Sequence, residues 1–228
     1  MKQGNTIFIT GANRGIGYYL VKECVSRQFN IIGTCRNIDN SKDLINIKYD
    51  NLNIFEMNVI DALSISKVSE NIRAPLDYLI CNAGINNGFG NLFDEDHSHK
   101  EMLDVLNVNV LGCILTIKYL IRHLNSNSKI ILMSSIMGVQ EHNGSSATIY
   151  RASKAAVNNV MVSISEELKS KQITVVSFHP GWVRTDMGGP NATLSPQESA
   201  SYLIQSFINL KLENSGKFYN YDGSLINF

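Results

Sequence analysis

The sequence predicts an α/β fold of the Rossmann type, in which a doubly wound parallel sheet is covered by helices on both faces. Three observations predict it. Short segments rich in β-branched residues alternate with longer segments that have helical spacing. The strand segments are apolar along nearly their whole length, as parallel strands buried on both faces are. A turn with three glycines joins the first strand segment to the first helical one.

The strand segments set the order of the sheet. Each is a short apolar run, bounded by residues that favour turns, such as Gly, Pro, Asn and Asp. The C-terminal sequence "GKFYNYDG" supplies one further edge strand. The predicted strands are 5–10, 30–35, 52–59, 76–81, 129–135 and 173–179, with the edge strand in 216–223.

The helical segments lie between these strands. Because connections between parallel strands are right-handed, the alternation gives a sheet with helices on both faces. No repeat or linker divides the chain, and 228 residues are enough for one well-buried domain but few for two. We therefore expect a single dinucleotide-binding domain over residues 1–228. The predicted helices are 15–28, 62–73, 98–124, 148–170 and 196–211.

Composition and charge exclude several classes of partner. The chain is 44% apolar and 18% charged, which is typical of a soluble globular protein. It has 20 basic and 20 acidic residues and no long basic run, so neither nucleic acid nor an anionic membrane surface is an expected partner. The apolar run near the start is too short for a secretory signal, and no uninterrupted run approaches the ~18 residues of a membrane span. The expected location is the cytoplasm.

The cysteines and histidines predict no metal site and no disulfide. All four cysteines lie in apolar segments and none forms a Cys-x-x-Cys pair, so free buried thiols are expected. The sequence "HSH" at 97–99 has no accompanying Cys or carboxylate cluster. The cysteines are Cys24, Cys35, Cys81 and Cys113.

The glycine turn "TGANRGIG", residues 10–17, indicates a dinucleotide phosphate site. Gly11, Gly15 and Gly17 follow a strand and open a helix. Glycine permits a tight turn there and allows a pyrophosphate to approach the N–H groups of the helix N-terminus. An ordinary strand-to-helix turn is the alternative, but that would need one glycine rather than three.

The end of the second strand favours NADP(H) over NAD(H). An NAD site usually places an acid there to hold the ribose 2′-hydroxyl. Here Cys35 and Arg36 stand at that point, and the nearest acid is Asp39. Arg14 lies in the glycine turn, so two guanidiniums are available for a 2′-phosphate. The alternative is that Arg36 is a solvated strand end.

The stretch "TIYRASKAAVNNV", residues 148–160, places a tyrosine and a lysine on one face of a helix. Tyr150 and Lys154 are four residues apart, which is one helical turn. A phenol beside an ammonium is either a surface pair or an acid whose pKa is lowered. Such a lowered pKa would suit proton transfer to the oxygen of a carbonyl that receives a hydride.

These motifs together resemble the short-chain dehydrogenase/reductase family over essentially the whole chain. The matching pieces stand in the family's order and spacing. The resemblance implies a parallel sheet of about seven strands, and within the family the chain looks most like C-factor and sniffer-type carbonyl reductases. The pieces are "TGANRGIG" (10–17), "CNAG" (81–84), "NVNVLG" (107–112), "ILMSS" (131–135), "YRASK" (150–154) and "HPGWVRT" (179–185).

The resemblance implies four catalytic residues. Tyr150 matches the catalytic acid and Lys154 its partner, which would lower the tyrosine pKa. Ser135 matches the serine that binds the substrate oxygen. Asn109 matches the asparagine that holds a water linking the lysine to solvent.

Each of these assignments has an alternative. The Tyr-x-x-x-Lys pair alone would be an exposed helix pair. A serine at the end of a strand can cap a backbone group, and Ser134 is a candidate for that role. The asparagine can bond its own helix backbone, and Asn107 competes with Asn109.

The glycine turn and the resemblance together define the predicted cofactor site. Asn58 stands where many relatives have an aspartate, and Cys81 replaces the first asparagine of "NNAG". The resemblance implies that Pro180, Gly181, Val183 and Thr185 border the nicotinamide. The predicted cofactor-binding residues are Gly11, Asn13, Arg14, Gly15, Ile16, Gly17, Arg36, Asn58, Val59, Asn82, Ala83, Gly84, Tyr150, Lys154, Pro180, Gly181, Val183 and Thr185.

The expected function is NADP(H)-dependent reduction of a small carbonyl compound, with a homodimer as the expected assembly. One alternative is a cofactor-binding signalling protein of the C-factor type, whose turnover is incidental. Another is a sugar-nucleotide epimerase or dehydratase, but the ~40 residues after Thr185 are too few for the substrate domain those enzymes need.

Overall fold

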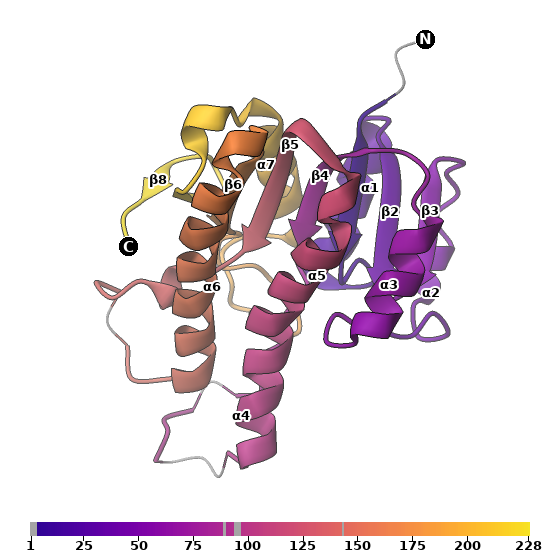
Figure 1. The fold of residues 1–228 in the computed structure, drawn as a ribbon. Coiled ribbons are helices and arrows are strands. Elements are labelled where there is room, and N and C mark those ends of the chain that lie inside the picture. Colours follow the sequence, from indigo (N-terminus) through magenta and orange to yellow (C-terminus); the bar gives the residue numbers. More distant parts are fainter. Residues whose placement is uncertain (1–3, 89, 94–96, 143) are drawn as a thin grey trace.

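The computed structural model describes residues 4–228 except 89, 94–96 and 143. Its strands form one eight-stranded sheet in the order β3-β2-β1-β4-β5-β6-β7-β8. The first seven are parallel and β8 is antiparallel to β7. The predicted Rossmann-type fold is therefore confirmed (Figure 1). The strands are β1 (Thr6–Thr10), β2 (Asn30–Cys35), β3 (Leu52–Glu56), β4 (Leu76–Cys81), β5 (Leu124–Met133), β6 (Thr174–His179), β7 (Phe218–Asn220) and β8 (Leu225–Ile226).

The C-terminal edge differs from the single strand predicted in 216–223. The strand predicted there is β7, and after a tight turn in which Gly223 takes a φ of +86° the chain forms an additional strand, β8, beyond residue 223. The Asp222 carboxylate accepts hydrogen bonds from the backbone N–H and the hydroxyl of Ser224, which fixes the turn. The sheet therefore ends in a short hairpin.

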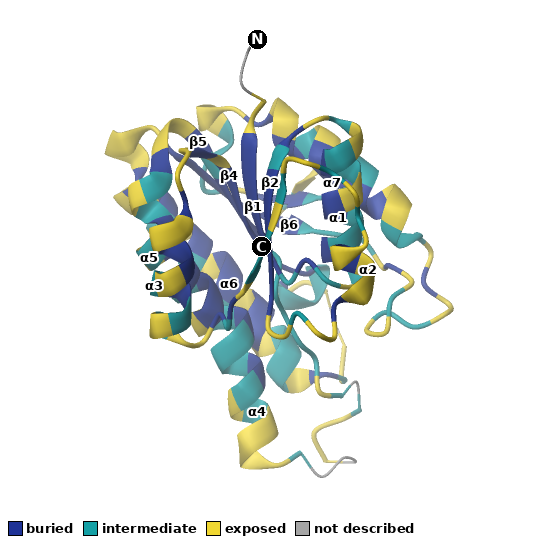
Figure 2. Cartoon of the chain, turned by 90° about the vertical axis from the view of Figure 1, so that its right-hand side faces the viewer, coloured by how far each residue is buried: buried dark blue, intermediate teal, exposed yellow. Residues whose placement is uncertain are grey.

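Helices cover both faces of the sheet. One apolar layer joins α1 and α7 to the sheet, and α2 packs with them; the other joins α3, α5 and α6 to the opposite face. The strands β1, β2, β4 and β6 between these layers are buried along most of their length, whereas β3 and β8 at the sheet edges have no buried residue (Figure 2). The helices are α1 (Gly15–Ser26), α2 (Lys42–Ile45), α3 (Ala62–Asn71), α4 (His99–Leu106), α5 (Gly112–Leu120), α6 (Thr148–Glu167) and α7 (Pro196–Asn209).

The helix predicted over 98–124 is interrupted. Ser98 and Glu101 start α4 with a capping box, and a π-helical turn, η1 (Asn107–Leu111), separates α4 from α5. The run His99–His123 is long and apolar enough to span a membrane by length and composition. In the fold, Ile117 and Leu120 of this run are buried in the core against the sheet, as expected for a core helix.

The four cysteines are free and buried, as predicted. Cys81 and Cys113 share a side-chain hydrogen bond at the end of β4. Within the described residues, no group of three His, Cys, Asp or Glu side chains is arranged to hold a metal ion.

Candidate active site

A cleft of about 620 Å³ lies at the carboxyl ends of the central strands. It is where a doubly wound sheet binds its ligand, because the helices on the two faces diverge there. The walls include Asn37, Asn40, Asp186 and Met187, which the sequence did not single out as cofactor-binding residues. The predicted cofactor residues on its walls are Gly11, Asn13, Arg14, Gly15, Ile16, Gly17, Arg36, Asn58, Val59, Asn82, Ala83, Gly84, Tyr150, Lys154, Pro180 and Thr185.

Two predicted cofactor residues do not line this cleft. The Val183 side chain is buried, and Val183 forms a β-bridge with Leu194. Gly181 takes a φ of +86°, and a Cβ there would lie 2.4 Å from the Leu194 side chain. Both residues therefore shape the turn that leaves β6, rather than the wall of the cleft.

The glycine turn forms the floor of the cleft. Gly11 and Gly15 have φ values of +66° and +53°, which favour glycine. A Cβ on Gly17 would lie 2.0 Å from the carbonyl oxygen of Gly11, so no side chain fits there. The backbone of Gly11 in the turn therefore packs directly against the backbone of Gly17 in α1.

The N-terminus of α1 is suited to a phosphate because it is uncapped and adjoins the cleft. Side chains cap the N-termini of α3, α4 and α7, through Asp61, Ser98 and Ser195. The N-cap of α1 is Arg14, whose side chain makes no cap hydrogen bond. The first-turn N–H groups of α1 therefore have no side-chain acceptor, and they adjoin a cleft large enough for a dinucleotide. The residues present fit that cofactor.

Asn82 and Thr10 hold the glycine turn in place. The Asn82 side-chain amide donates to the carbonyl oxygens of Thr10 and Gly11 at 3.0 and 3.1 Å. The Thr10 hydroxyl accepts from the backbone N–H groups of Asn82 and Ala83, both at 3.0 Å. The ends of β1 and β4 are therefore cross-linked, and a primary role of Asn82 is to support the turn.

The two predicted arginines both line the cleft. Arg36 is exposed after β2, beside Asn37 and Asn40. Arg14 forms an exposed ion pair with Asp186, with 3.0 Å between guanidinium nitrogen and carboxylate oxygen. After β3, Asn58 lines the cleft and its side-chain oxygen accepts from the N–H of Ile60 at 3.3 Å. Both cationic side chains thus line the cofactor cleft, Arg36 after β2 and Arg14 in the glycine turn.

The predicted catalytic side chains meet where α6 passes the end of β5. Tyr150 hydrogen-bonds the side chain of Ser135. Lys154 is buried, and its Nζ donates to the carbonyl oxygen of Met133 at 2.8 Å and lies 5.4 Å from the centre of the Tyr150 ring. The Ser134 hydroxyl donates to the carbonyl oxygen of Lys154 at 3.2 Å. Ser134 therefore bonds a backbone group, the structural role for which the sequence made it a candidate.

A close approach of η3 (Ile136–Gly138) to α6 brings Ser135 to Tyr150. A Cβ on Gly138 would lie 2.6 Å from the carbonyl carbon of Lys154, so only glycine allows this approach. The Ser135 hydroxyl also accepts from the N–H of Met137 at 3.1 Å. The serine is therefore held by its own turn while it faces the tyrosine.

The expected lowering of the Tyr150 pKa is not found among the contacts that the chain itself supplies. Burial raises the pKa of Tyr150 to about 12, and the hydrogen bond with Ser135 offsets this only in part. Burial also lowers the pKa of Lys154 to about 8, against a smaller opposing effect of Cys113. The Lys154 pKa is lowered because its ammonium faces the Tyr150 ring and the carbonyl oxygen of Met133 and is buried from solvent. In this state Tyr150 is a neutral phenol at physiological pH, ready to donate a proton.

Asn109 lies in the π-helical turn η1 with its side chain fully engaged. Its Oδ1 accepts from the N–H of Ile85 at 2.8 Å, and its Nδ2 donates to the Ile85 carbonyl at 2.9 Å and the Ser153 hydroxyl at 3.0 Å. A Cβ on Gly84 would lie 3.3 Å from Asn109 Oδ1 and 3.6 Å from Lys154 Nζ. Asn109 thus braces the segment after β4 beside the lysine, and its part in a proton relay stays a prediction.

A second, small cavity of about 20 Å³ lies on the other side of Tyr150. Its walls come from the segment after β4, from α4 and from the start of α6, and they include Asn86, Glu101 and Ile149. Tyr150 is the residue that lines both this cavity and the cofactor cleft.

The stability of the cofactor-free chain is expected to depend on pH through Lys154. Between pH 8 and 10.5 the unfolded chain keeps a proton on this lysine that the folded chain has lost, so the free energy of unfolding rises with pH across this window. Lys154→Met should therefore be more stable than the wild type below pH 8, by about 3 kcal/mol at most, and this advantage should shrink as pH rises to 10.5.

Urea unfolding from pH 7 to 10.5 measures this difference. Lys118→Met, at an exposed position of α5, is the matched control for removing a lysine. A stability difference between wild type and Lys154→Met that stays constant over the whole pH range would contradict the assignment.

Residues 5–194 match the family model described as short chain dehydrogenase. The solved structure of the carbonyl reductase Sniffer of D. melanogaster has a TM-score of 0.93 and 32% identity, covering 99% of this chain and 100% of that one. The NADPH-bound carbonyl reductase from chicken fatty liver has a TM-score of 0.91 and 29% identity, with the same coverage. The C-signal of Myxococcus xanthus is 34% identical over 153 residues, which are 66% of this chain and 91% of that protein.

Proposed function

The chain belongs to the short-chain dehydrogenase family and is an oxidoreductase similar in structure to carbonyl reductases; on this premise we propose that it reduces a small ketone, aldehyde or quinone to an alcohol with NADPH. One observation carries the proposal: Tyr150, which hydrogen-bonds Ser135, and Lys154 stand on the wall of the cleft whose floor is the glycine turn. Proton donor and cofactor site therefore face the same space.

Each catalytic side chain has a role that follows from its contacts. The nicotinamide, when bound, supplies the hydride. Ser135 donates a hydrogen bond to the substrate oxygen and Tyr150 donates its proton to that oxygen as negative charge develops. Lys154 lies over the face of the Tyr150 ring, where it holds the ring in place and supplies positive charge. Asn109 holds the wall formed by Gly84 and Ile85 in place.

The direct test is NADPH consumption with a panel of quinones, aromatic aldehydes, diketones and pterin-like ketones. We expect turnover with at least one class and none without a carbonyl compound. An enzyme that binds NADPH but reduces no member of the panel, or that oxidises NADPH without a substrate, contradicts the proposal.

NADPH is the proposed cofactor because the guanidiniums of Arg14 and Arg36 both line the cleft and can pair with a 2′-phosphate. The NADPH found in the chicken carbonyl reductase structure supports this choice. Replacing Arg36 by Gln should weaken NADPH binding by about tenfold and leave NADH binding unchanged, since a hydrogen bond to a charged group contributes roughly 1.5–3 kcal/mol.

The Kd of each cofactor, from the fluorescence of the bound nicotinamide, tests this prediction. Arg14→Gln should act in the same direction, and the double variant should lose the preference for NADPH. A wild type that binds NADH as tightly as NADPH, or an Arg36→Gln variant that loses both equally, would show that the arginines do not select the cofactor.

A signalling function is the second candidate, since the C-signal of Myxococcus xanthus is similar over 153 residues. In that case cofactor binding would matter and turnover would be incidental. A variant with Ser135→Ala and Tyr150→Phe separates the two functions: full biological activity of this variant would make catalysis secondary.

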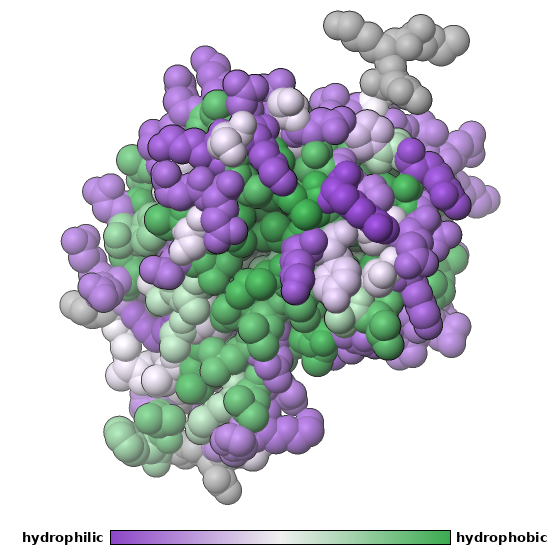
Figure 3. Space-filling model, in the orientation of Figure 1, coloured by the Kyte–Doolittle hydropathy of each residue, from purple (hydrophilic) through white to green (hydrophobic). Residues whose placement is uncertain are grey.

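The proposed assembly is a cytoplasmic homodimer. Apolar side chains gather along the face formed by α5 and α6 (Figure 3). The exposed Leu103, Leu111 and Val162 belong to α4, η1 and α6, which is the region where a second copy is expected to bind. Sedimentation at micromolar concentration tests this assembly.

A further inference from the structure

The segment between β6 and α7 is a closed loop rather than a free strap. At its base, the N–H of Arg184 donates to the carbonyl oxygen of Leu194 at 2.8 Å, and the N–H of Leu194 donates to that of Trp182 at 3.0 Å. These bonds surround the β-bridge between Val183 and Leu194. Residues 182 and 194 are thus held side by side, and residues 185–192 project from this base as the loop's outer part.

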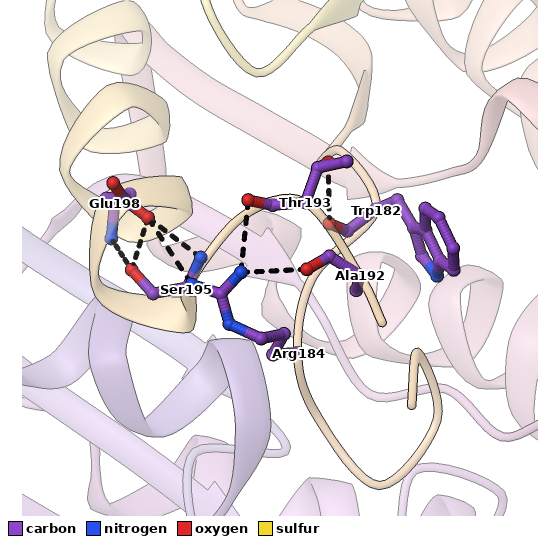
Figure 4. A network of polar contacts seen from close by, with 6 residues as sticks. All are labelled: Trp182, Arg184, Ala192, Thr193, Ser195 and Glu198. Carbon is purple, nitrogen blue, oxygen red and sulfur yellow. Dashed lines mark hydrogen bonds and ion pairs between the residues drawn. The ribbon is translucent and has the colours of Figure 1, made fainter. Parts of the chain in front are cut away.

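The side chain of Arg184 ties the returning arm of this loop (Figure 4). One guanidinium nitrogen donates to the carbonyl oxygens of Ala192 and Thr193 at 2.8 and 3.1 Å. Another lies 3.9 Å from the carboxylate of Glu198 in the first turn of α7. A planar guanidinium can make these contacts together, because its five N–H donors point in fixed directions.

The tip of the loop is placed on the cofactor cleft. The indole N–H of Trp182 donates to the carbonyl oxygen of Gly188 at 2.8 Å, and the Thr185 hydroxyl accepts from the N–H of Gly188 at 3.1 Å. Thr185, Asp186 and Met187 line the cleft. Asp186 pairs with Arg14, so the tip and the glycine turn meet across the cleft mouth.

We propose that Arg184 is a positioning residue that closes loop 182–194 and thereby holds residues 185–187 over the cofactor and substrate. Arg184 itself is not part of the cleft wall. It acts through the carbonyl oxygens it binds, which lie on the arm opposite to the tip. Its consequence for catalysis rests on the proposed function, whereas its effect on the loop does not.

The test replaces the guanidinium and keeps the aliphatic stem. Arg184→Met removes the donors, and we expect the NADPH Kd and the carbonyl KM to rise about tenfold, which corresponds to the loss of one charge-assisted contact. The kcat should stay within about threefold of wild type, since Tyr150 and Ser135 are untouched. Arg184→Lys keeps the positive charge but lacks the several N–H donors of the guanidinium. Its NADPH Kd and carbonyl KM should lie between those of the wild type and those of Arg184→Met.

Trp182 gives a readout that needs no turnover, because it is the one tryptophan of the chain. Its bond to Gly188 ties it to the loop tip, so Arg184→Met should increase acrylamide quenching of its fluorescence in the cofactor-free protein. Arg73→Met, at an exposed position outside the loop, is the matched control and should leave Trp182 quenching and the NADPH Kd unchanged.

The outcomes separate this inference from the proposed function. Wild-type quenching and wild-type NADPH Kd in Arg184→Met would overturn the positioning role, as would a lower kcat at unchanged KM and Kd. Absence of carbonyl turnover in the wild type would sink the proposed function, while the quenching experiment would still decide the role of Arg184. If Arg184→Met does not fold, Arg184→Lys carries the same comparison.

Discussion

Replacing Tyr150 by Phe is expected to lower kcat by a factor of about 100 to 10,000, the usual contribution of a positioned acid. The ring fills the same space, so the packing against Lys154 is kept and the NADPH Kd should stay near that of the wild type. The lost group is the hydroxyl that hydrogen-bonds Ser135 and faces the substrate. Steady-state reduction of a panel substrate, with NADPH binding measured in parallel, tests this prediction.

Tyr202→Phe is the matched control, since it removes a hydroxyl from an exposed tyrosine on α7. It should leave kcat and KM unchanged. Near-normal turnover in Tyr150→Phe would mean that another group, or water, protonates the product oxygen, and the roles given to Ser135 and Lys154 would fall with it.

Replacing Gly17 by Ala is expected to have the largest effect on stability and cofactor binding. The new methyl group would lie 2.0 Å from the carbonyl oxygen of Gly11 and 2.6 Å from the side-chain amide of Asn82. That amide donates two of the hydrogen bonds that hold the glycine turn. We expect the free energy of unfolding to fall by about 3 kcal/mol or more, because the clash can be relieved only by moving the backbone of the turn. We also expect no measurable NADPH binding.

Gly15→Ala is the control in the same turn. Its Cβ would meet only the Thr185 methyl group, at 3.5 Å, so the loss comes from its φ of +53° and should be about 1 to 2 kcal/mol. Urea unfolding and NADPH titration measure both variants. Equal losses for the two would show that the strain of the turn, rather than the contact with Gly11, accounts for the effect.

The strands and the glycine turn could be predicted because their signals are local. A buried parallel strand needs an unbroken apolar run, and a turn that meets a helix end closely needs glycine. The predicted starts of β2 and β4 agree with the structure. Boundaries set by other segments were less predictable: β3 ends at Glu56 rather than at residue 59, because β2, its pairing partner, ends at Cys35 opposite Glu56.

Most of the residues that line the cleft could be named from the sequence, although Gly181 and Val183 do not line it, whereas the electrostatics of the site could not be predicted. The spacing of Tyr150 and Lys154 on one helix puts both on the same side whatever the rest of the fold does. The pKa of each depends on burial and on a neighbour from another segment, Ser135 for Tyr150 and Cys113 of α5 for Lys154, which no local pattern encodes. The expectation of a lowered Tyr150 pKa was therefore wrong for the cofactor-free chain.

Local pattern thus established the Rossmann-type sheet, the glycine turn and the placement of a phenol and an ammonium one helical turn apart, since each depends on residues near in sequence. Packing between distant segments decided three further features: the burial that makes Tyr150 a weak acid, the brace between Asn109 and Ile85, and the loop that Arg184 closes. These three depend on atoms from separate elements, and only the folded chain brings those atoms within hydrogen-bonding distance.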